Sequence, residues 1–420
     1  MPTYTSPGLY LEEVQPVRAQ EWKTAIPAFL GYVRGPQATP LVLRHWPQFS
    51  ARFGDALPEG HLAYAVRGFF ENGGTVCYVV PMRHADTPQH ALMDACRAVE
   101  TLHEPDLICA PDLAITHTGE RRSVAEMASL QAFLIHPGPE FGQSPTLRHM
   151  LILDSPPGLD LPAERKYCAE LIGQAKGRGA TELELAGAAL YYPWVAAPRF
   201  VPPNDPTGVG GQVETVLTPP SGHVAGVFAR SDAAAGIRKA PANEALAGVL
   251  DTEVRLSDND QGQLFVAGDQ DPIPPGAVNC LRAFPGRGIR IWGARTLSSD
   301  VEWRYINVRR LFLNTIRWME RRLQDLVFEP SGPDLWARIR RELNAYCFSL
   351  YQSGALKGAT INEAFYVRCD ESINSRELRD EGIVQAEVGL AAARPYEFII
   401  IRLIQRDGGI SLTGAITGEI

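Results

Sequence analysis

The stretch that says most about the fold is NCLRAFPGRGIRIWGARTL, from Asn279 to Leu297. Within it, GIRIW (288–292) alternates apolar residues with larger polar or aromatic ones directly behind a glycine turn, which predicts a short strand. A phosphate-binding loop would place Lys and then Ser or Thr after its last glycine, and a dinucleotide site would open a helix there. The run does neither, and Cys280 is its only potential nucleophile. It is therefore predicted to be a turn and strand inside a packed domain.

Upstream of this run, residues 26–194 alternate strand-like apolar runs with helical patterns. Such alternation predicts an α/β layer in which helices pack on a sheet. Two Pro- and Gly-rich segments follow, of which Phe200–Gly222 is predicted to be a long loop or hairpin and Ser257–Gly276 a loop. The strands are expected at residues 28–33, 75–80, 106–110 and 150–154, and the helices at 61–71, 89–102, 124–135 and 163–175.

Downstream of the run the pattern changes to long helices. Val301–Phe328 is the strongest helical segment, and a second helix, Pro333–Tyr351, is expected to pack on it as a hairpin. Arg310, Arg317 and Arg321 fall close together on one side of the first helix, as a basic stripe or as an ordinary solvated helix face. The apolar side chains share the other face, which is expected to pack inward: Val308, Phe312, Ile316, Met319, Leu323 and Leu326.

Composition describes a folded globular chain. Its 420 residues are 45% hydrophobic, enough for about two or three domains with cores of their own. No apolar run approaches the length of a membrane span and the first residues lack a signal-peptide pattern, so the chain is expected to be made and folded in a cytoplasm. The net charge of −8 gives no general attraction to nucleic acid. The seven cysteines show no CxxC spacing and are expected to be buried small hydrophobes.

Candidates for catalysis are few. His117 lies between two threonines near Asp112, and Asp154 ends a predicted strand, where α/β enzymes place catalytic carboxylates. A solvated loop histidine and an Asx-type turn explain the same residues without chemistry. No metal-ligand spacing, GxSxG elbow or Walker loop occurs, so the sequence predicts no catalytic residue, no cofactor and no metal. An α/β enzyme is the alternative, and it requires these three side chains to converge in one pocket.

Both ends of the chain carry short apolar segments outside the α/β alternation. Leu9–Val14 is bounded by prolines, and Ile410–Ile416 is set off from the preceding strand-like run by a pair of glycines. Frayed termini are the bland interpretation. Arms that pair with the sheet edge of another molecule fit these apolar residues better, because pairing satisfies the backbone and buries the side chains.

Several segments match one protein family in family order along nearly the whole chain. With these segments the chain resembles the contractile tail sheath proteins of bacteriophages and of phage-tail-like injection machines. They are PGLYLEEV (7–14), FENGGTVCYVV (70–80), PPSGHVAGVFARSD (219–232), KAPANE (239–244), the run at 279–297, GALKG (354–358) and PYEFIIIRLIQ (395–405).

The resemblance implies a structural subunit rather than an enzyme. Sheaths of this family polymerise helically around an inner tube and contract to drive that tube through a target envelope, from a metastable extended state and without nucleotide hydrolysis. The implied fold is an outer α/β layer, an inner carboxy-terminal domain of long helices with a small sheet, and an extended arm at each end. In the family the arms add strands to neighbouring subunits, and a charged helix of the inner domain grips the tube. The implied residues are Leu9, Tyr10, Leu11, Val14, Ile410, Leu412 and Ile416 for the arms, Gly408 and Gly409 for the hinges, and Arg310, Arg317 and Arg321 for the tube.

The implied partners are further copies of this chain in stacked rings, expected to be hexameric, together with an inner tube protein, baseplate proteins, tail-terminator or cap proteins and sibling sheath proteins. No nucleic acid and no membrane insertion are implied. The moderate length resembles the injection machines more than the largest phages, and a phage tail sheath or another tail or baseplate protein is the alternative. The chain is expected to divide into residues 1–24 (arm and linker), 25–200 (α/β domain with an insertion at about 85–185), 201–278 (loop-rich connection), 279–405 (inner domain) and 406–420 (arm).

Overall fold

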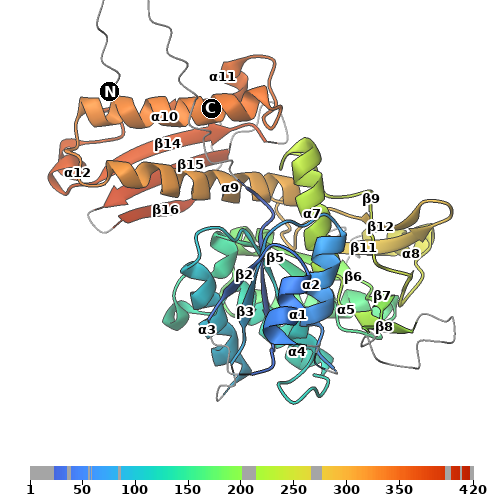
Figure 1. The fold of residues 1–420 in the computed structure, drawn as a ribbon. Coiled ribbons are helices and arrows are strands. Elements are labelled where there is room, and N and C mark those ends of the chain that lie inside the picture. Colours follow the sequence, from blue (N-terminus) through green and yellow to red (C-terminus); the bar gives the residue numbers. More distant parts are fainter. Residues whose placement is uncertain are drawn as a thin grey trace, which may run out of the picture.

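The apolar runs of the first half of the chain form one large sheet (Figure 1). The structure, a computed structural model, describes residues 23–35, 39–54, 57, 59–83, 87–200, 214–265, 277–392, 399–406 and 409–416, with the backbone alone for 265 and for the last two ranges. Among these residues the sheet has nine strands in the order β2-β3-β1-β4-β5-β6-β11-β12-β9. In that order they are Leu41–Leu43, Cys77–Pro81, Pro27–Gly31, Leu107–Cys109, Met150–Asp154, Ala188–Tyr192, Val278–Phe284, Gly288–Trp292 and Glu244–Ala245.

The centre of the sheet is parallel, from β3 through β1, β4, β5 and β6 to β11, and antiparallel strands close both edges. Parallel neighbours need crossover connections, and helices supply most of them. Strands that follow β6 in the sequence form a small antiparallel sheet in the order β10-β7-β8 (Asp251–Thr252, Val195–Pro198, Thr215–Thr218). The helices are α1 Pro47–Phe53, α2 Leu62–Glu71, α3 Pro88–Glu100, α4 Val124–Ile135, α5 Leu161–Gly177, α6 Glu182–Ala186, α7 Ser221–Ala235 and α8 Asp258–Phe265.

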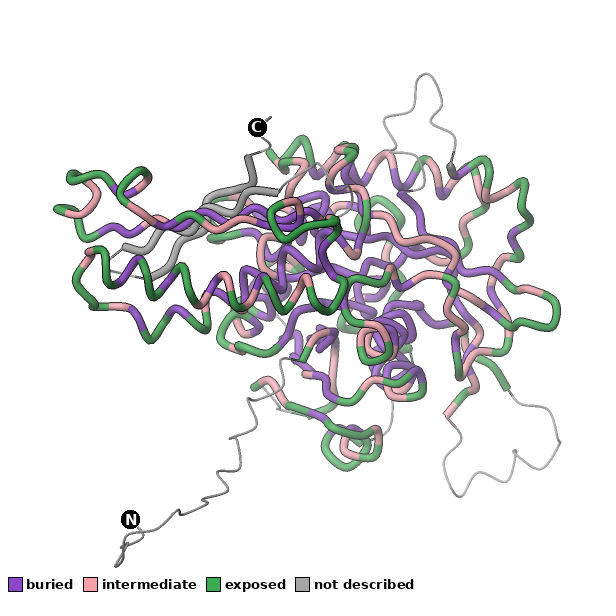
Figure 2. The backbone as a smooth tube through the Cα atoms, turned by 90° about the horizontal axis from the view of Figure 1, so that it is seen from above, coloured by how far each residue is buried: buried purple, intermediate pink, exposed green. Residues whose placement is uncertain are grey.

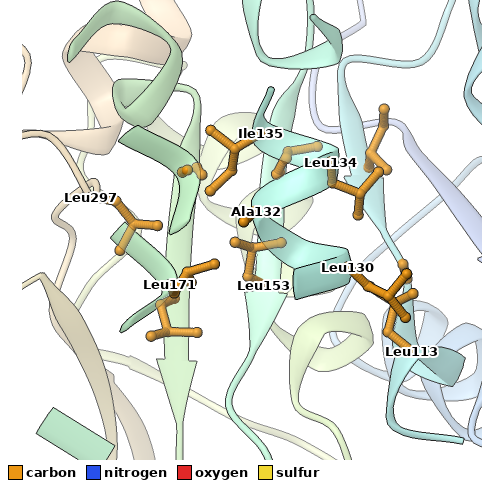
Figure 3. Close-up of a cluster of buried hydrophobic side chains, with 14 of the residues drawn as sticks. Leu113, Leu130, Ala132, Leu134, Ile135, Leu153, Leu171 and Leu297 are labelled. Carbon is orange, nitrogen blue, oxygen red and sulfur yellow. The ribbon is translucent and has the colours of Figure 1, made fainter. Parts of the chain in front are cut away.

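Successive residues of each central strand enter different cores, because side chains alternate across a sheet. In β1, Leu30 packs in the core that holds α3, α4 and α5, whereas Phe29 packs in the core that holds α2 and α7. Figure 3 shows the first of these cores, where Leu153 of β5 meets Leu171 of α5 and Ala132 of α4. Helices on both faces explain why these strands are apolar at nearly every position.

The run Asn279–Leu297 forms the hairpin β11–β12, as its pattern predicts. Since β11 also pairs with β6, the hairpin completes the large sheet instead of opening the next domain. The domain boundary predicted at residue 279 is therefore wrong, and the large-sheet unit extends to about Leu297. The predicted insertion at 85–185 is wrong as well, because that segment supplies the central strands β4 and β5.

Two other segments differ from the predicted loops. Residues 258–265, expected to be loop, form α8, because Ser257 and Asp260 cap each other: the Ser257 hydroxyl accepts from the Asp260 amide at 3.2 Å and the Asp260 carboxylate accepts from the Ser257 amide at 2.8 Å. In Phe200–Gly222 the hairpin prediction is confirmed, since β8 pairs with β7. Helix α7 begins inside the same segment.

The C-terminal unit consists of a helical hairpin on a second antiparallel sheet, β13-β14-β15-β16 (Phe365–Arg368, Val384–Leu390, Ile399–Arg406, Gly409–Ile416). Figure 1 shows helix α9 on the side of this unit that faces the large sheet. The predicted apolar face of α9 is confirmed, since all its members are buried in the core of this unit. Figure 2 shows buried residues concentrated in the interior of the molecule and exposed residues along its outer helices and turns. The helices of the C-terminal unit are α9 Ile306–Leu323, α10 Pro333–Gln352, α11 Ile361–Ala364 and α12 Arg376–Asp380.

Candidate functional site

Asp112 and Asp154, the carboxylates considered for catalysis, both cap helices. One Asp112 oxygen accepts from the amides of His61 (2.7 Å) and Leu62 (3.1 Å) at the start of α2, and the other accepts from Tyr32 (2.8 Å). Asp154 accepts from the Ser221 amide at 2.8 Å, at the start of α7. Burial raises the pKa of Asp112 to about 6 and that of Asp154 to about 7. Both side chains are thus committed to joining helices to the sheet.

His117 lies on an exposed turn, whereas Asp112 and Asp154 are buried. None of the hydrogen bonds of Asp112 or Asp154 described above involves it, and it lines neither of the two large cavities described below. No group of three or more His, Cys, Asp or Glu able to hold a metal ion occurs in the described ranges. All seven cysteines are buried free thiols, as predicted.

The arginines of the β11–β12 run hold neighbouring segments of the same chain. Arg282 donates to Asp258 at 2.7 Å and so ties α8 to the sheet. Arg290 donates to the carbonyl of Asn243 at 2.6 Å, and Arg287 to its side chain at 2.9 Å. Because Asn243 belongs to the KAPANE segment, these bonds join two of the family-like motifs. The run therefore has a structural role: its arginines hold α8 and the 239–244 segment against the large sheet.

The arginines predicted to form an exposed basic stripe on α9 are mostly buried. Arg310 is 2% exposed and Arg317 is 8% exposed, whereas Arg321 is exposed. The prediction is therefore wrong for Arg310 and Arg317. Helical periodicity places them correctly opposite the apolar face, but that opposite side is covered by the large-sheet unit. A buried ion-paired face and a solvated face have the same sequence pattern.

Two carboxylates of the large-sheet unit receive these arginines. Arg310 makes two bonds to Asp232, at 3.0 and 2.6 Å, and lies 3.7 Å from Asp106. Arg317 lies 3.8 Å from Asp106 and donates to the carbonyl of Glu104 at 2.6 Å. Burial opposes the charge on Arg310, yet Asp232 and Asp106 raise its pKa above the ordinary value. We call Asp106, Asp232, Arg310 and Arg317 the interdomain clamp.

A further buried arginine, Arg309, was not anticipated from the sequence. It is 1% exposed, donates to the carbonyl of Thr146 at 2.9 Å and lies 5.5 Å from the ring centres of both Trp303 and Phe312. Burial lowers its pKa to about 9. Consecutive arginines at 309 and 310 were the available signal, because two adjacent positions on a helix cannot both lie at the centre of one solvated face.

A groove runs beside the clamp, between α9, α10 and the loop that precedes β4. It comprises two adjoining cavities of about 640 and 980 Å³. The stacked rings of Trp318 and Tyr346, 3.9 Å apart, line the larger cavity together with Lys23. Lys23, four residues before β1, therefore lies at the wall of this groove.

The predicted arm residues fall largely outside the structure's description. Leu9, Tyr10, Leu11 and Val14 lie outside the described residues, as does the hinge candidate Gly408. Gly409 begins β16, which also contains Ile410, Leu412 and Ile416. Strand β16 pairs with β15 of the same chain, with Leu412 opposite Leu403 and Ile416 opposite Ile400. The C-terminal segment thus occupies one edge of the small sheet, and β13 lies at the other.

Family models match the chain in two adjacent blocks. Residues 169–297 match the family described as the phage tail sheath protein central domain, and residues 298–406 match the phage tail sheath C-terminal domain. The junction between the two blocks coincides with the end of the large-sheet unit. No curated protein sequence matches the chain. No helix in the described ranges is long and apolar enough to cross a membrane.

Solved structures similar to the chain come from contractile particles. The helical sheath of the anti-feeding prophage in its contracted state is 28% identical with a TM-score of 0.67, over 94% of this chain and 98% of that one. The contracted sheath complex of PVC, an extracellular contractile injection system, is 26% identical with a TM-score of 0.66, over 94% and 96%. A sheath tail protein from Listeria innocua shares the fold at 10% identity and a TM-score of 0.55, over 96% of each chain.

Proposed function

The chain belongs to the contractile tail sheath protein family, and we propose that it is the repeating subunit of a sheath that surrounds an inner tube and contracts to drive that tube through a target envelope. The observation that carries this proposal is the whole-chain similarity to sheaths of the anti-feeding prophage and PVC, which covers both units and extends over 94% of the chain. An injection system is favoured over a phage tail, since the PVC sheath, which belongs to an extracellular contractile injection system, is 26% identical over 94% of this chain.

The proposed partners are other copies of the chain in stacked, hexameric rings, an inner tube, and baseplate and cap proteins at the two ends. A chain similar to this one is part of the anti-feeding prophage baseplate, at 27% identity, which supports the baseplate contact. Assembly is proposed to take place in a bacterial cytoplasm. We assign the subunit no catalytic role, and the carboxylates that an enzyme would need are instead bound to helix amides.

Strand exchange is the proposed way in which subunits join. Strand β13 lies at an edge of the small sheet, where an added strand would pair with its backbone groups. We propose that Ile410–Ile416 of one copy takes the place of β16 beside β15 of its neighbour, in the register that the single chain already shows. We propose β13 as the acceptor for Leu9–Val14, whose two glutamates suit the exposed Arg368. Head-to-tail exchange of this kind yields a helical filament when its rotation does not close.

We propose that a set of arginines other than the one predicted from the sequence contacts the tube. Arg310 and Arg317 are engaged in the interdomain clamp, so they cannot meet a tube without breaking it. Arg321, Arg340 and Arg341 are exposed on the same helical hairpin. They are the proposed basic surface for an acidic tube.

Electron microscopy tests the proposal directly. The purified chain at high concentration, alone and with an inner tube protein, is expected to form hollow striated tubes in negative stain. Removing residues 1–20 or 407–420 should leave a folded monomer, measured by circular dichroism and sedimentation, and should abolish the tubes. Tubes that survive either truncation would refute the assignment of that arm, and a wild-type chain that forms none under any of these conditions would refute the function.

A further inference from the structure

A strained junction precedes β1. Ala25, the residue two before β1, has φ of 56° and is 2% exposed. This left-handed conformation is unfavourable for a residue with a side chain, because Cβ comes too close to the following carbonyl oxygen. Such strain persists only where the surroundings over-determine it, and it concentrates at switches and other functional positions.

Carboxylates of the interdomain clamp hold this junction in place. Asp106 accepts from the amide of Ala25 at 2.9 Å and from that of Ile26 at 2.6 Å. Asp232 accepts from the hydroxyl of Thr24 at 2.6 Å. The carbonyl of Ile26 in turn accepts from the Asp106 amide at 3.0 Å. Residues 24–26 are therefore held by two carboxylates: Asp106, which directly precedes β4, and Asp232, which lies in α7.

The same oxygens also serve helix α9. Oδ2 of Asp232 receives both the Thr24 hydroxyl and Nη2 of Arg310, each at 2.6 Å. Oδ2 of Asp106 receives the Ala25 amide and lies within 4 Å of Arg310 and Arg317. A rotation of the chain at Thr24 and Ala25 would pull these oxygens away from the arginines. Conversely, a shift of α9 would free the carboxylates from the junction.

We infer that the interdomain clamp fixes the direction of the backbone at residues 23–26, just before β1, and couples that direction to the position of α9. Asp106 and Asp232 are positioning residues in this arrangement. The inference rests on the proposed function, because it makes the clamp the point where load on the N-terminal arm passes into the C-terminal unit. Its physical content is nonetheless a property of the isolated subunit and can be measured there.

The test is a distance distribution between two spin labels in the unassembled full chain, diluted with unlabelled protein. One label is placed at Lys23→Cys, which is exposed beside the junction, and the other at Ala345→Cys, which is exposed on α10. The native cysteines are buried, and the chain without introduced cysteines serves as the labelling control. The background chain is expected to give one narrow distance by double electron–electron resonance.

Two matched substitutions at Thr24 separate positioning from general stability. Thr24→Ser keeps the hydroxyl and should keep the narrow distance, whereas Thr24→Val removes only the bond to Asp232 and should lose it. Circular dichroism verifies that both variants fold. A narrow distance in Thr24→Val, or a broad one in the background chain, would overturn the inference.

A third variant tests the coupling to α9. Asp232→Asn keeps an oxygen that can accept from Thr24 but removes the charge that orders Arg310, so it should also broaden the distribution. A distribution as narrow as that of Thr24→Ser would overturn the coupling. Tube formation is measured separately by electron microscopy. Tubes formed by a chain whose distance distribution is broad would refute only the role of the clamp. A narrow distribution in a wild-type chain that forms no tubes would refute only the proposed function.

Discussion

Replacing Arg310 with Met should lower the free energy of unfolding more than any substitution at an exposed position of α9. The substitution keeps an unbranched apolar chain of similar length and removes only the guanidinium. Asp232, with 5% of its side chain exposed, loses both of its bonds to Arg310, and Asp106, with 7% exposed, loses a neighbouring positive charge. Removing one partner of a buried ion pair costs about 3–5 kcal/mol, because the remaining charge stays buried without compensation.

The contact of Arg310 with the ring of Phe228, whose centre lies 4.8 Å from the guanidinium carbon, is lost as well. Its contribution of about 0.5–2 kcal/mol is no larger than the width of that range. The folded-to-unfolded ratio should therefore decrease by roughly a hundredfold to a few thousandfold. Urea unfolding followed by tryptophan fluorescence, at a concentration where the chain does not assemble, measures the change. Arg341→Met is the matched control, and at its exposed position it should cost less than about 0.5 kcal/mol.

A double variant identifies the ion pair as the cause. Arg310→Met combined with Asp232→Leu replaces both charges by apolar groups, which often restores much of the lost stability. The double variant should therefore be more stable than the sum of the two single losses predicts. A loss of less than about 1 kcal/mol for Arg310→Met, or two losses that simply add, would contradict the role of the buried ion pair.

Three further predictions concern the tube, the small sheet and pH. Reversing Arg340 and Arg341 to Glu should abolish cosedimentation with an acidic inner tube while circular dichroism stays unchanged; binding at the wild-type level would place the contact elsewhere. Cysteines at positions 403 and 412 in separate copies, mixed before assembly, should form disulfide-linked dimers in the sheath, since Leu403 and Leu412 are opposite each other in the β15–β16 register; bonds formed only when both cysteines share one chain would exclude strand exchange. Burial raises the pKa of Glu164 from 4.5 to about 8, so the folded state keeps a proton that the unfolded chain releases, and stability present at low pH is lost as pH rises through this window. Glu164→Gln should flatten that decline, which is on the order of a few kcal/mol, and an unchanged difference between urea midpoints at pH 5 and pH 8 would contradict it.

Much of the large-sheet unit was predictable from local patterns. The bounds of β5 and α4 coincide with those expected from the sequence. Helix α4 has a reciprocal cap between Ser123 and Glu126, and β5 is an unbroken apolar run, so neither element depends on distant contacts for its limits. Helix α8 was missed because Asp at its third position is a weaker signal of a reciprocal cap than Glu.

The domain boundary could not be found in the same way. The hairpin β11–β12 is followed directly by long helices, so its pattern is compatible with either unit. Its assignment depends on the pairing of β11 with β6, nearly ninety residues earlier in the chain. Pairing between segments so far apart is decided by how the whole sheet closes, which no local window contains.

By itself, the sequence determined the alternation of strands and helices, the apolar face of α9 and the membership of the sheath family, because periodicity and ordered motifs are properties of the chain alone. Only the tertiary structure decided the role of Arg310 and Arg317. A helical period states the angle at which a side chain leaves its helix and says nothing about what lies at that angle. Here Asp106 and Asp232 lie there, brought from more than seventy residues away, and they convert a predicted tube-facing stripe into the clamp between the two units.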